Sequence, residues 1–268
     1  MRWLIVGAVV CFSVTIAFTQ TARWSKIHEY KAKSIHAWDV DPMGKVVISQ
    51  GDILTKLDTS FAELFSQSTK RLGDIAVLDA RHSLKTLVFS EDQQVITFVD
   101  NTLTFQDRTN DLADFSVAYA TNVCYSNQTN RFWIYDGDNA RLLLIDDHGR
   151  QNSTINNLTA ITRESEPALL FEQGNELMLF YPSKGIYLFD YYGSLMRFYP
   201  MTGAQTVYFD RNYFYFIKGS EIVRIDRKTD EKLKVALPVS DVNALRVSGS
   251  FIFLEVPHAI QKYSLRWE

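Results

Sequence analysis

Residues 131–146, RFWIYDGDNARLLLID, hold the pattern that decides the fold: an apolar strand, a tight polar turn, and a second apolar strand that closes on aspartate. The pattern recurs at residues 45–58, 86–100, 176–190, 213–226 and 251–264. The closing residues, 36–46 positions apart, are Asp58, Asp100, Asp146, Asp190, Asp226 and Ser264. A period of about 40 residues with several strands per unit is typical of propeller blades. The sequence therefore predicts an all-β, six-bladed β-propeller.

Each unit has room for four strands. A shorter apolar run precedes each hairpin and is expected to form the innermost strand, whereas a more polar run follows and should form the outer edge. The sixth unit lacks this outer run, because only LRWE follows Ser264. Near the N-terminus, RWSKIHEYKAK at residues 23–33 places apolar side chains among charges. We therefore predict that pairing of the N- and C-terminal segments closes the ring.

The closing aspartates have a structural interpretation. An aspartate at a strand end can cap the following turn by accepting backbone N–H bonds. A catalytic group is needed once, whereas this aspartate appears in five of the six units. We therefore expect these residues to stabilise turns.

The first nineteen residues differ from the rest. Arg2 precedes an apolar and small-residue stretch, WLIVGAVVCFSVTIAF, at residues 3–18, followed by polar residues. This is the arrangement of a secretory signal peptide, and sixteen apolar residues are short for a membrane span. We predict a signal peptide at 1–19 and a single propeller domain at 20–268. The mature protein is expected to be periplasmic or secreted. An uncleaved membrane anchor is the alternative.

Composition narrows the function classes. The net charge of −3 and the pI near 6.0 offer no basic face, so nucleic-acid binding has no support. Cys11 lies in the predicted signal, which leaves Cys124 alone in an apolar run, so no disulfide is expected and this thiol should be buried and inert. Stability must come from packed sheets.

Motifs of catalysis and cofactor binding are missing from the sequence. The five histidines have no metal-ligand spacing, and no nucleophile elbow, phosphate loop or dinucleotide motif occurs. We therefore predict no metal, no cofactor and no catalytic residue. Two carboxylate pairs, Asp39/Asp41 and Asp74/Asp79, would serve as acid and base or hold a cation if they faced the central channel. We favour the other interpretation, that these are solvated residues at strand ends, because acid–base work needs a geometry that the sequence does not show.

The six units with an Asp-ended second strand resemble six-bladed propellers of the NHL and YWTD type over the whole mature chain. Runs such as VITFVDNTLTFQ at residues 95–106, after an export signal, are also similar to envelope propellers of Bacteroidota, including Plug-type subunits of the type 9 secretion translocon. The resemblance implies a protein partner in an envelope membrane complex. The chain lacks the YWTD tetrapeptide and any repeated Gly-His or Trp-Asp pair, which argues against receptor-type and WD40 functions.

The predicted function is a non-catalytic protein-binding or scaffold subunit at the cell envelope. The candidate contact residues are aromatic: Trp133 and Tyr135 in the third unit, and Tyr191 and Tyr192 in the turn after Asp190. We expect at least one ring of the Tyr191–Tyr192 pair to project into solvent. The alternative is a propeller enzyme, of the hydrolase, lyase or cyclase type, with its site in the central channel.

Overall fold

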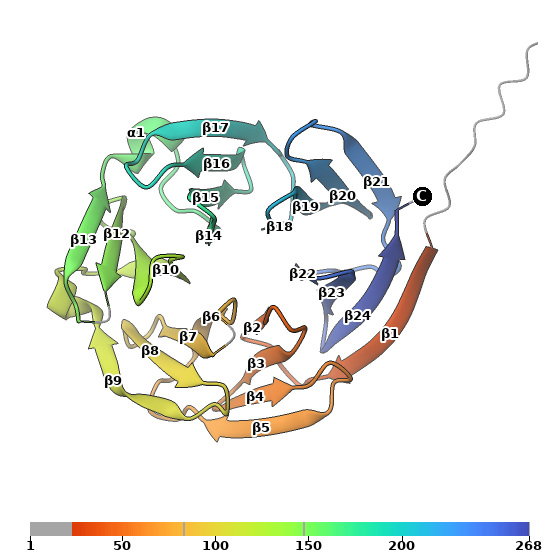
Figure 1. The fold of residues 1–268 in the computed structure, drawn as a ribbon, viewed down its shortest axis with the longest axis horizontal. Coiled ribbons are helices and arrows are strands. Elements are labelled where there is room, and N and C mark those ends of the chain that lie inside the picture. The colour runs from red at the N-terminus through yellow and green to blue at the C-terminus, as the bar shows by residue number, and fades with distance from the viewer. Residues whose placement is uncertain (1–22, 83, 147, 268) are drawn as a thin grey trace, which may run out of the picture.

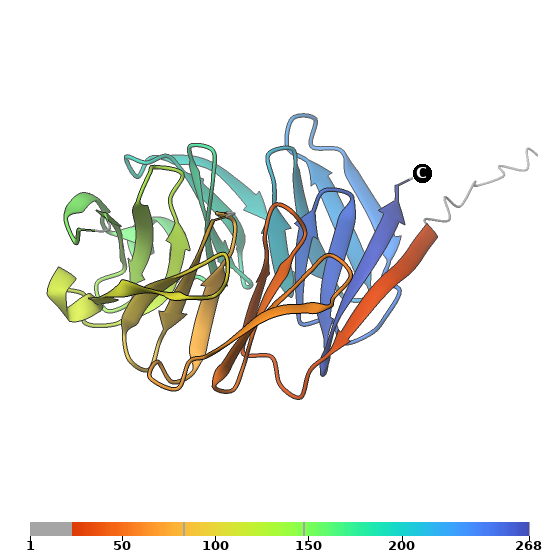
Figure 2. The same cartoon turned by 60° about the horizontal axis from the view of Figure 1, so that its bottom comes forward.

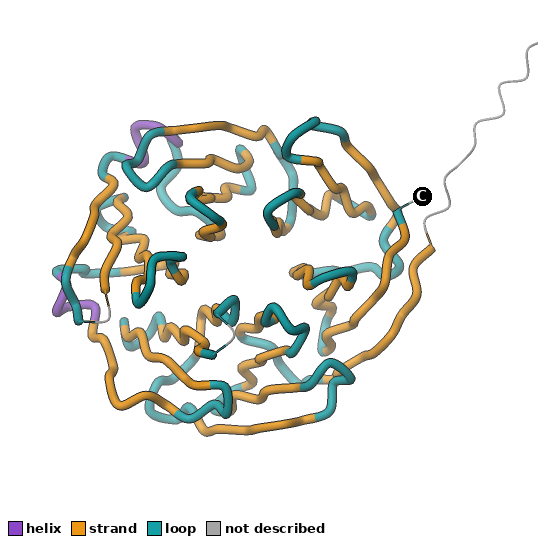
Figure 3. The backbone as a smooth tube through the Cα atoms, viewed as in Figure 1, coloured by secondary structure: helices purple, strands orange, loops and turns teal. Residues whose placement is uncertain are grey.

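The computed structural model describes residues 23–82, 84–146 and 148–267. Over these residues the chain forms six four-stranded antiparallel sheets arranged as blades around a central axis (Figure 1). Within each blade the strands step outward from this axis, and the outermost strands form the rim (Figure 3). The predicted six-bladed all-β propeller is confirmed.

The strands of each blade are given from the innermost to the outermost. Blade 1 comprises β2 (Ala37–Val40), β3 (Val46–Gln50), β4 (Ile53–Leu57) and β5 (Glu63–Ser68). Blade 2 comprises β6 (Ile75–Asp79), β7 (Lys85–Ser90), β8 (Val95–Asp100) and β9 (Phe105–Asp111). Blade 3 comprises β10 (Ala120–Tyr125), β11 (Arg131–Asp136), β12 (Arg141–Asp146) and β13 (Gln151–Ile155). Blade 4 comprises β14 (Leu169–Gln173), β15 (Glu176–Tyr181), β16 (Gly185–Phe189) and β17 (Leu195–Pro200). Blade 5 comprises β18 (Thr206–Phe209), β19 (Tyr213–Lys218), β20 (Glu221–Asp226) and β21 (Lys232–Ala236). Blade 6 comprises β22 (Ala244–Ser248), β23 (Phe251–Val256), β24 (Ala259–Arg266) and β1 (Arg23–Lys31).

Blade 6 combines strands from opposite ends of the sequence. β1 pairs antiparallel with β24, from Arg23 opposite Arg266 to Lys31 opposite Ala259, and the two strands run together along one side of the ring (Figure 2). The Trp24 ring packs edge-on against Tyr263, with 5.5 Å between ring centroids, and its indole N–H donates to the carbonyl of Ala236 in blade 5. The N-terminal strand thus joins blades 5 and 6.

The hydrophobic core lies between blades. Six clusters of described buried side chains each occupy the space between two neighbouring blades, including the space between blades 6 and 1. Both faces of a blade are therefore covered, and the central strands read as continuous apolar runs: β11 is buried from Phe132 to Asp136. Cys124 is buried as expected, and this burial raises the pKa of its thiol, so the thiol stays protonated.

The closing aspartates cap the turns between the third and fourth strands. The Oδ1 atom of Asp100 accepts the N–H groups of Thr102 and Thr104 at 2.8 and 3.0 Å. Asp190 accepts the N–H groups of Tyr192 and Ser194 at 2.9 and 2.8 Å, and Asp58, Asp146 and Asp226 make equivalent bonds. The predicted structural role of these residues is confirmed. Ser264 differs because it lies inside β24.

These turns predict acid sensitivity. Hydrogen bonds from their turns lower the pKa of Asp58, Asp100, Asp190 and Asp226 in the folded state. A lowered folded-state pKa contributes stability above the unfolded value of about 3.9, and this stability is lost as pH falls through the folded values. We expect the unfolding free energy, measured by urea denaturation, to fall between pH 5 and pH 3. Asp100→Asn, which keeps an acceptor oxygen but does not titrate, should flatten this slope; an unchanged slope would contradict the assignment.

The described helices are short: η1 (Leu112–Phe115) and α1 (Leu158–Thr162). In the described part of the chain, no helix has the length and apolar character that crossing a membrane requires. The predicted signal peptide at residues 1–19 lies outside the described residues.

Candidate functional site

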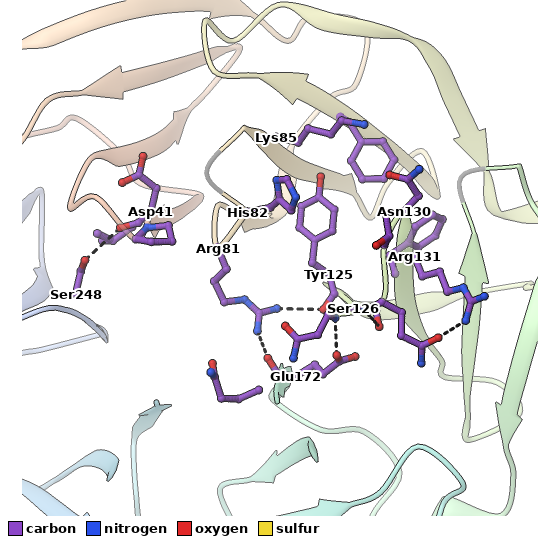
Figure 4. Close-up of a pocket in the computed structure, with 18 of the residues that line it drawn as sticks. Asp41, Arg81, His82, Lys85, Tyr125, Ser126, Asn130, Arg131, Glu172 and Ser248 are labelled. Atoms are coloured by element: carbon purple, nitrogen blue, oxygen red, sulfur yellow. Dashed lines mark hydrogen bonds between the residues drawn. The ribbon is translucent and has the colours of Figure 1, made fainter. Parts of the chain in front are cut away.

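The turns that follow the innermost strands gather at one end of the ring, where they line a cavity of about 730 Å³, the mouth cavity (Figure 4). Every blade contributes to its wall. One lining residue from each, in blade order, is Val40, Arg81, Tyr125, Glu172, Tyr208 and Val247. A cavity of this size is typical of small-molecule sites.

Asp39 joins three blades beside this cavity. Its carboxylate accepts the Nε–H of Arg246 from blade 6 at 2.9 Å and the backbone N–H of Ala80 from blade 2 at 2.8 Å. Burial raises the pKa of Asp39, although the Arg246 charge favours its ionised form. Removing one partner of such a pair would leave a buried charge uncompensated. Asp39 therefore connects blade 1 to blades 6 and 2.

Asp79 makes the corresponding connection between blades 2 and 3. It accepts the backbone N–H of Tyr125 at 2.9 Å and the Nε–H of Arg81 at 2.9 Å. Burial favours the neutral acid, but the charge and hydrogen bonds of Arg81 outweigh it and lower the pKa of Asp79. The Arg81 guanidinium also donates to the Glu172 carbonyl and lies 3.7 Å from the centroid of the Phe171 ring. Arg81 is thus held by blades 2 and 4.

Glu172, in β14, is 1% exposed and accepts three hydrogen bonds. One carboxylate oxygen takes the backbone N–H of Asn127 at 2.5 Å and the hydroxyl of Tyr191 at 2.6 Å. The other takes the indole N–H of Trp133 at 2.5 Å. These donors come from blades 3 and 4, so Glu172 fixes the boundary between them.

The two carboxylate pairs do not assemble into an acid–base site, and the favoured interpretation as solvated residues is wrong for Asp39, Asp41 and Asp79, which are buried. Asp39 is bound to Arg246, whereas Asp41 lines the mouth cavity and caps its own turn by accepting the N–H groups of Met43 and Lys45. Asp79 is bound to Arg81, whereas Asp74 lies against His36 at 3.2 Å, outside the residues that line the cavity. Among the described residues, no group of three His, Cys, Asp or Glu side chains is arranged to hold a metal ion.

The expectation that Trp133 and Tyr135 offer a contact surface is wrong. Both lie in β11, and both are 0% exposed. Alternation along a strand exposes one face only when that face meets solvent. In this ring both faces of blade 3 meet another blade, so neither ring reaches the surface.

The two tyrosines after Asp190 separate in the structure. Tyr191 packs against Trp133, with 6.3 Å between ring centroids, and its hydroxyl donates to the Glu172 carboxylate at 2.6 Å. Tyr192 is 92% exposed. The Tyr191 ring is therefore partly buried and supports the turn, whereas the Tyr192 ring projects into solvent.

Three exposed apolar side chains that were not predicted from the sequence follow Tyr192 in the chain. Leu195, Met196 and Phe198 of β17 are 43%, 55% and 40% exposed. We call Tyr192 and these three residues the blade-4 surface. A polar outer strand is expected at this position, but β17 contains the mostly apolar run LMRF. The outer strands of blades 1 and 3, ELFSQS and QNSTI, carry more polar residues.

Comparisons with known proteins bear on the fold. No protein-family model matches this chain, and no curated protein matches its sequence. Among solved structures it is similar to virginiamycin B lyase from Staphylococcus aureus, with a TM-score of 0.61 and 11% identity over 91% of this chain and all of the other. It is also similar to the Pan2 WD40 domain of Neurospora crassa, with a TM-score of 0.63 and 8% identity over 91% of this chain and 96% of the other. The Cps50 (Swd1) propeller domain of Myceliophthora thermophila matches with a TM-score of 0.61 and 12% identity over 87% of this chain and 83% of the other. At these identities the likeness shows the propeller fold alone.

Proposed function

We propose that this chain is a non-catalytic propeller that binds a protein partner through the blade-4 surface. The carrying observation is the group of exposed apolar side chains, Tyr192, Leu195, Met196 and Phe198, on and beside an outermost strand. Contiguous exposed apolar residues mark interaction sites, and an outermost strand can pair with a strand of another protein. A tyrosine as exposed as Tyr192 suits an interface anchor.

We further propose a cellular location and a partner for this chain. The signal-like segment at residues 1–19 supports export to the periplasm or beyond. In that compartment we propose a membrane complex of the cell envelope as the partner, with the chain as an accessory, Plug-type subunit of a type 9 secretion translocon. The support is the sequence resemblance described above. Affinity isolation from the native envelope, followed by mass spectrometry, tests this part: a stoichiometric membrane partner is expected.

The state of the carboxylates supports the non-catalytic proposal. Asp39, Asp79 and Glu172 each accept several structural hydrogen bonds, and Asp41 caps a turn. A general base needs a carboxylate or imidazole that can reach its substrate's proton. His82, which lines the mouth cavity beside Tyr125, favours the rival candidate, a propeller enzyme. Stoichiometric calcium or zinc in the purified protein, lost in His82→Ala, would support the enzyme instead.

If the blade-4 surface binds the partner, changing its most exposed residue should weaken that binding. Tyr192→Ser should weaken partner capture by roughly 30-fold, the effect of losing about 2 kcal/mol at an interface anchor. The melting temperature should not change, because the ring is exposed. Tyr119→Ser, at an exposed tyrosine in the loop before β10, is the control and should leave capture intact. Full capture by the Tyr192 variant at full stability would remove this surface from consideration.

A further inference from the structure

The mouth cavity extends sideways between blades 2 and 3. Its wall there includes Phe98 of β8, Asn110 of β9 and Phe132 of β11, so it reaches as far as the outermost strand of blade 2. We call this part the lateral lobe; the other lining residues that we assign to it are Lys85, Gln106, Tyr125, Asn130 and Arg131. Figure 4 shows Lys85, Tyr125 and Arg131 on one side of the cavity and Asp41 with Ser248 on the other.

The lateral lobe is cationic. Lys85 and Arg131 both line it, and no ion pair between described residues includes either of them. The Arg131 guanidinium donates to the side chain of Gln128. The described carboxylates that line the cavity, Asp41 and Glu172, come from blades 1 and 4, outside the lobe. Uncompensated cations in a partly enclosed cavity favour an anionic ligand.

Two polar atoms of the lobe have no hydrogen-bond partner among the described residues. Asn110 is 3% exposed; its amide nitrogen donates to the Ile96 carbonyl at 3.3 Å, but its Oδ1 accepts nothing. The Tyr125 hydroxyl is also unpartnered, and it points toward Lys85 (Figure 4). Burial, with the Asp79 charge, raises the pKa of Tyr125, so the phenol keeps its proton and can donate. Buried polar groups are normally paired, and unpaired ones call for an explanation.

The remaining wall is aromatic. The Phe98 ring lies 5.6 Å from the Tyr125 ring and 5.9 Å from the Phe132 ring, measured between centroids. Rings at these distances form a continuous apolar wall. Cations, unpaired polar atoms and aromatic walls in one cavity are the usual parts of a small-ligand site.

We propose that the lateral lobe binds a carboxylate attached to an apolar, ring-sized body. Lys85 and the Tyr125 hydroxyl hold the carboxylate, and the rings of Phe98 and Phe132 enclose the body. Asn110 Oδ1 accepts an N–H or O–H group of the ligand. A peptide that ends in an aromatic residue and a free aromatic acid share this chemistry.

Three probes test the proposal by isothermal titration calorimetry on the full propeller: N-acetylglycylphenylalanine, its C-terminal amide, and 3-phenylpropionate. The acid peptide should bind at least about tenfold more tightly than its amide, because the charge-assisted contacts are lost in the amide. If the peptide also binds tenfold more tightly than 3-phenylpropionate, the source is a peptide end whose N–H reaches Asn110. Equal affinity for the two acids assigns the lobe to free aromatic acids.

Variants locate the site. Lys85→Met should remove the preference for acid over amide. Lys218→Met, at an exposed position in β19 of blade 5, should keep it. Tyr125→Phe should also lower the affinity for the acid. Its melting temperature should not fall, because the hydroxyl has no partner in the protein, so this variant reports on binding even if Lys85→Met does not fold.

Equal binding of acid and amide, no binding of the acid at 10 mM, or an acid preference that survives both Lys85→Met and Tyr125→Phe would each overturn the proposal. These outcomes are independent of partner capture through the blade-4 surface, because the lobe and that surface share no residue.

Discussion

A chain that starts at Lys33 is expected to lose the cooperative melting transition of the whole ring. This deletion removes β1, leaves the edge of β24 unpaired and uncovers the Tyr263 ring that Trp24 packs against. It also removes the hydrogen bond from Trp24 to blade 5. Calorimetry should show a melting temperature more than about 10 °C below that of the chain starting at Gln20, or no transition at all.

The control for this deletion is a peptide of residues 20–33 added in trans. Because the peptide binds only the folded ring, it should raise the melting temperature of the shortened chain as its concentration increases. A shortened chain that melts within a degree or two of the longer one would contradict a stabilising role for β1.

Glu172→Ala is expected to destabilise the ring by about 4 kcal/mol, because it leaves three donors without their acceptor in a buried site. For a domain of this size the melting temperature should fall by about 10 °C. Urea denaturation measures the change in unfolding free energy directly.

Two variants separate this effect from the loss of a charge. Glu172→Gln keeps one acceptor oxygen and should lose less stability than the alanine variant. Glu63→Ala, at an exposed position in β5, should change stability by no more than about 0.5 kcal/mol. Equal stability of Glu172→Ala and Glu63→Ala would show that the three hydrogen bonds do not contribute.

The propeller fold was predictable because each repeating hairpin is formed by residues that are close in the sequence. Each hairpin lies within about sixteen residues, and its strands are apolar throughout because both faces of a blade are buried. Burial of both faces is also the reason that the prediction for Trp133 and Tyr135 was wrong. A strand that is covered on both sides has no polar face in its sequence, so the sequence does not show which of its aromatic rings are buried. Tyr191 and Tyr192 are neighbours in one turn, and only packing against Trp133 distinguishes them.

The mouth cavity was not predictable, because its parts meet only when the ring closes. Asp39 binds Arg246, which is 207 positions away in the sequence. Sequence adjacency groups Asp39 with Asp41 and Asp79 with Asp74, and it does not indicate that Asp39 binds Arg246. The aspartates of the closing turns were predictable for the opposite reason: their hydrogen-bond partners lie two to four residues ahead in the chain.

The pairing of Trp24 with Leu265 has a consequence for synthesis. After β1 has left the ribosome, it cannot find its partner until some 240 further residues have been made, which takes roughly ten to fifty seconds at 5–20 residues per second. Throughout that interval a growing chain carries an unsatisfied N-terminal strand and an open, extending stack of blades. Nascent chains stalled before β24 should therefore recruit holdase chaperones and be cut readily by proteases, whereas completed chains should resist both.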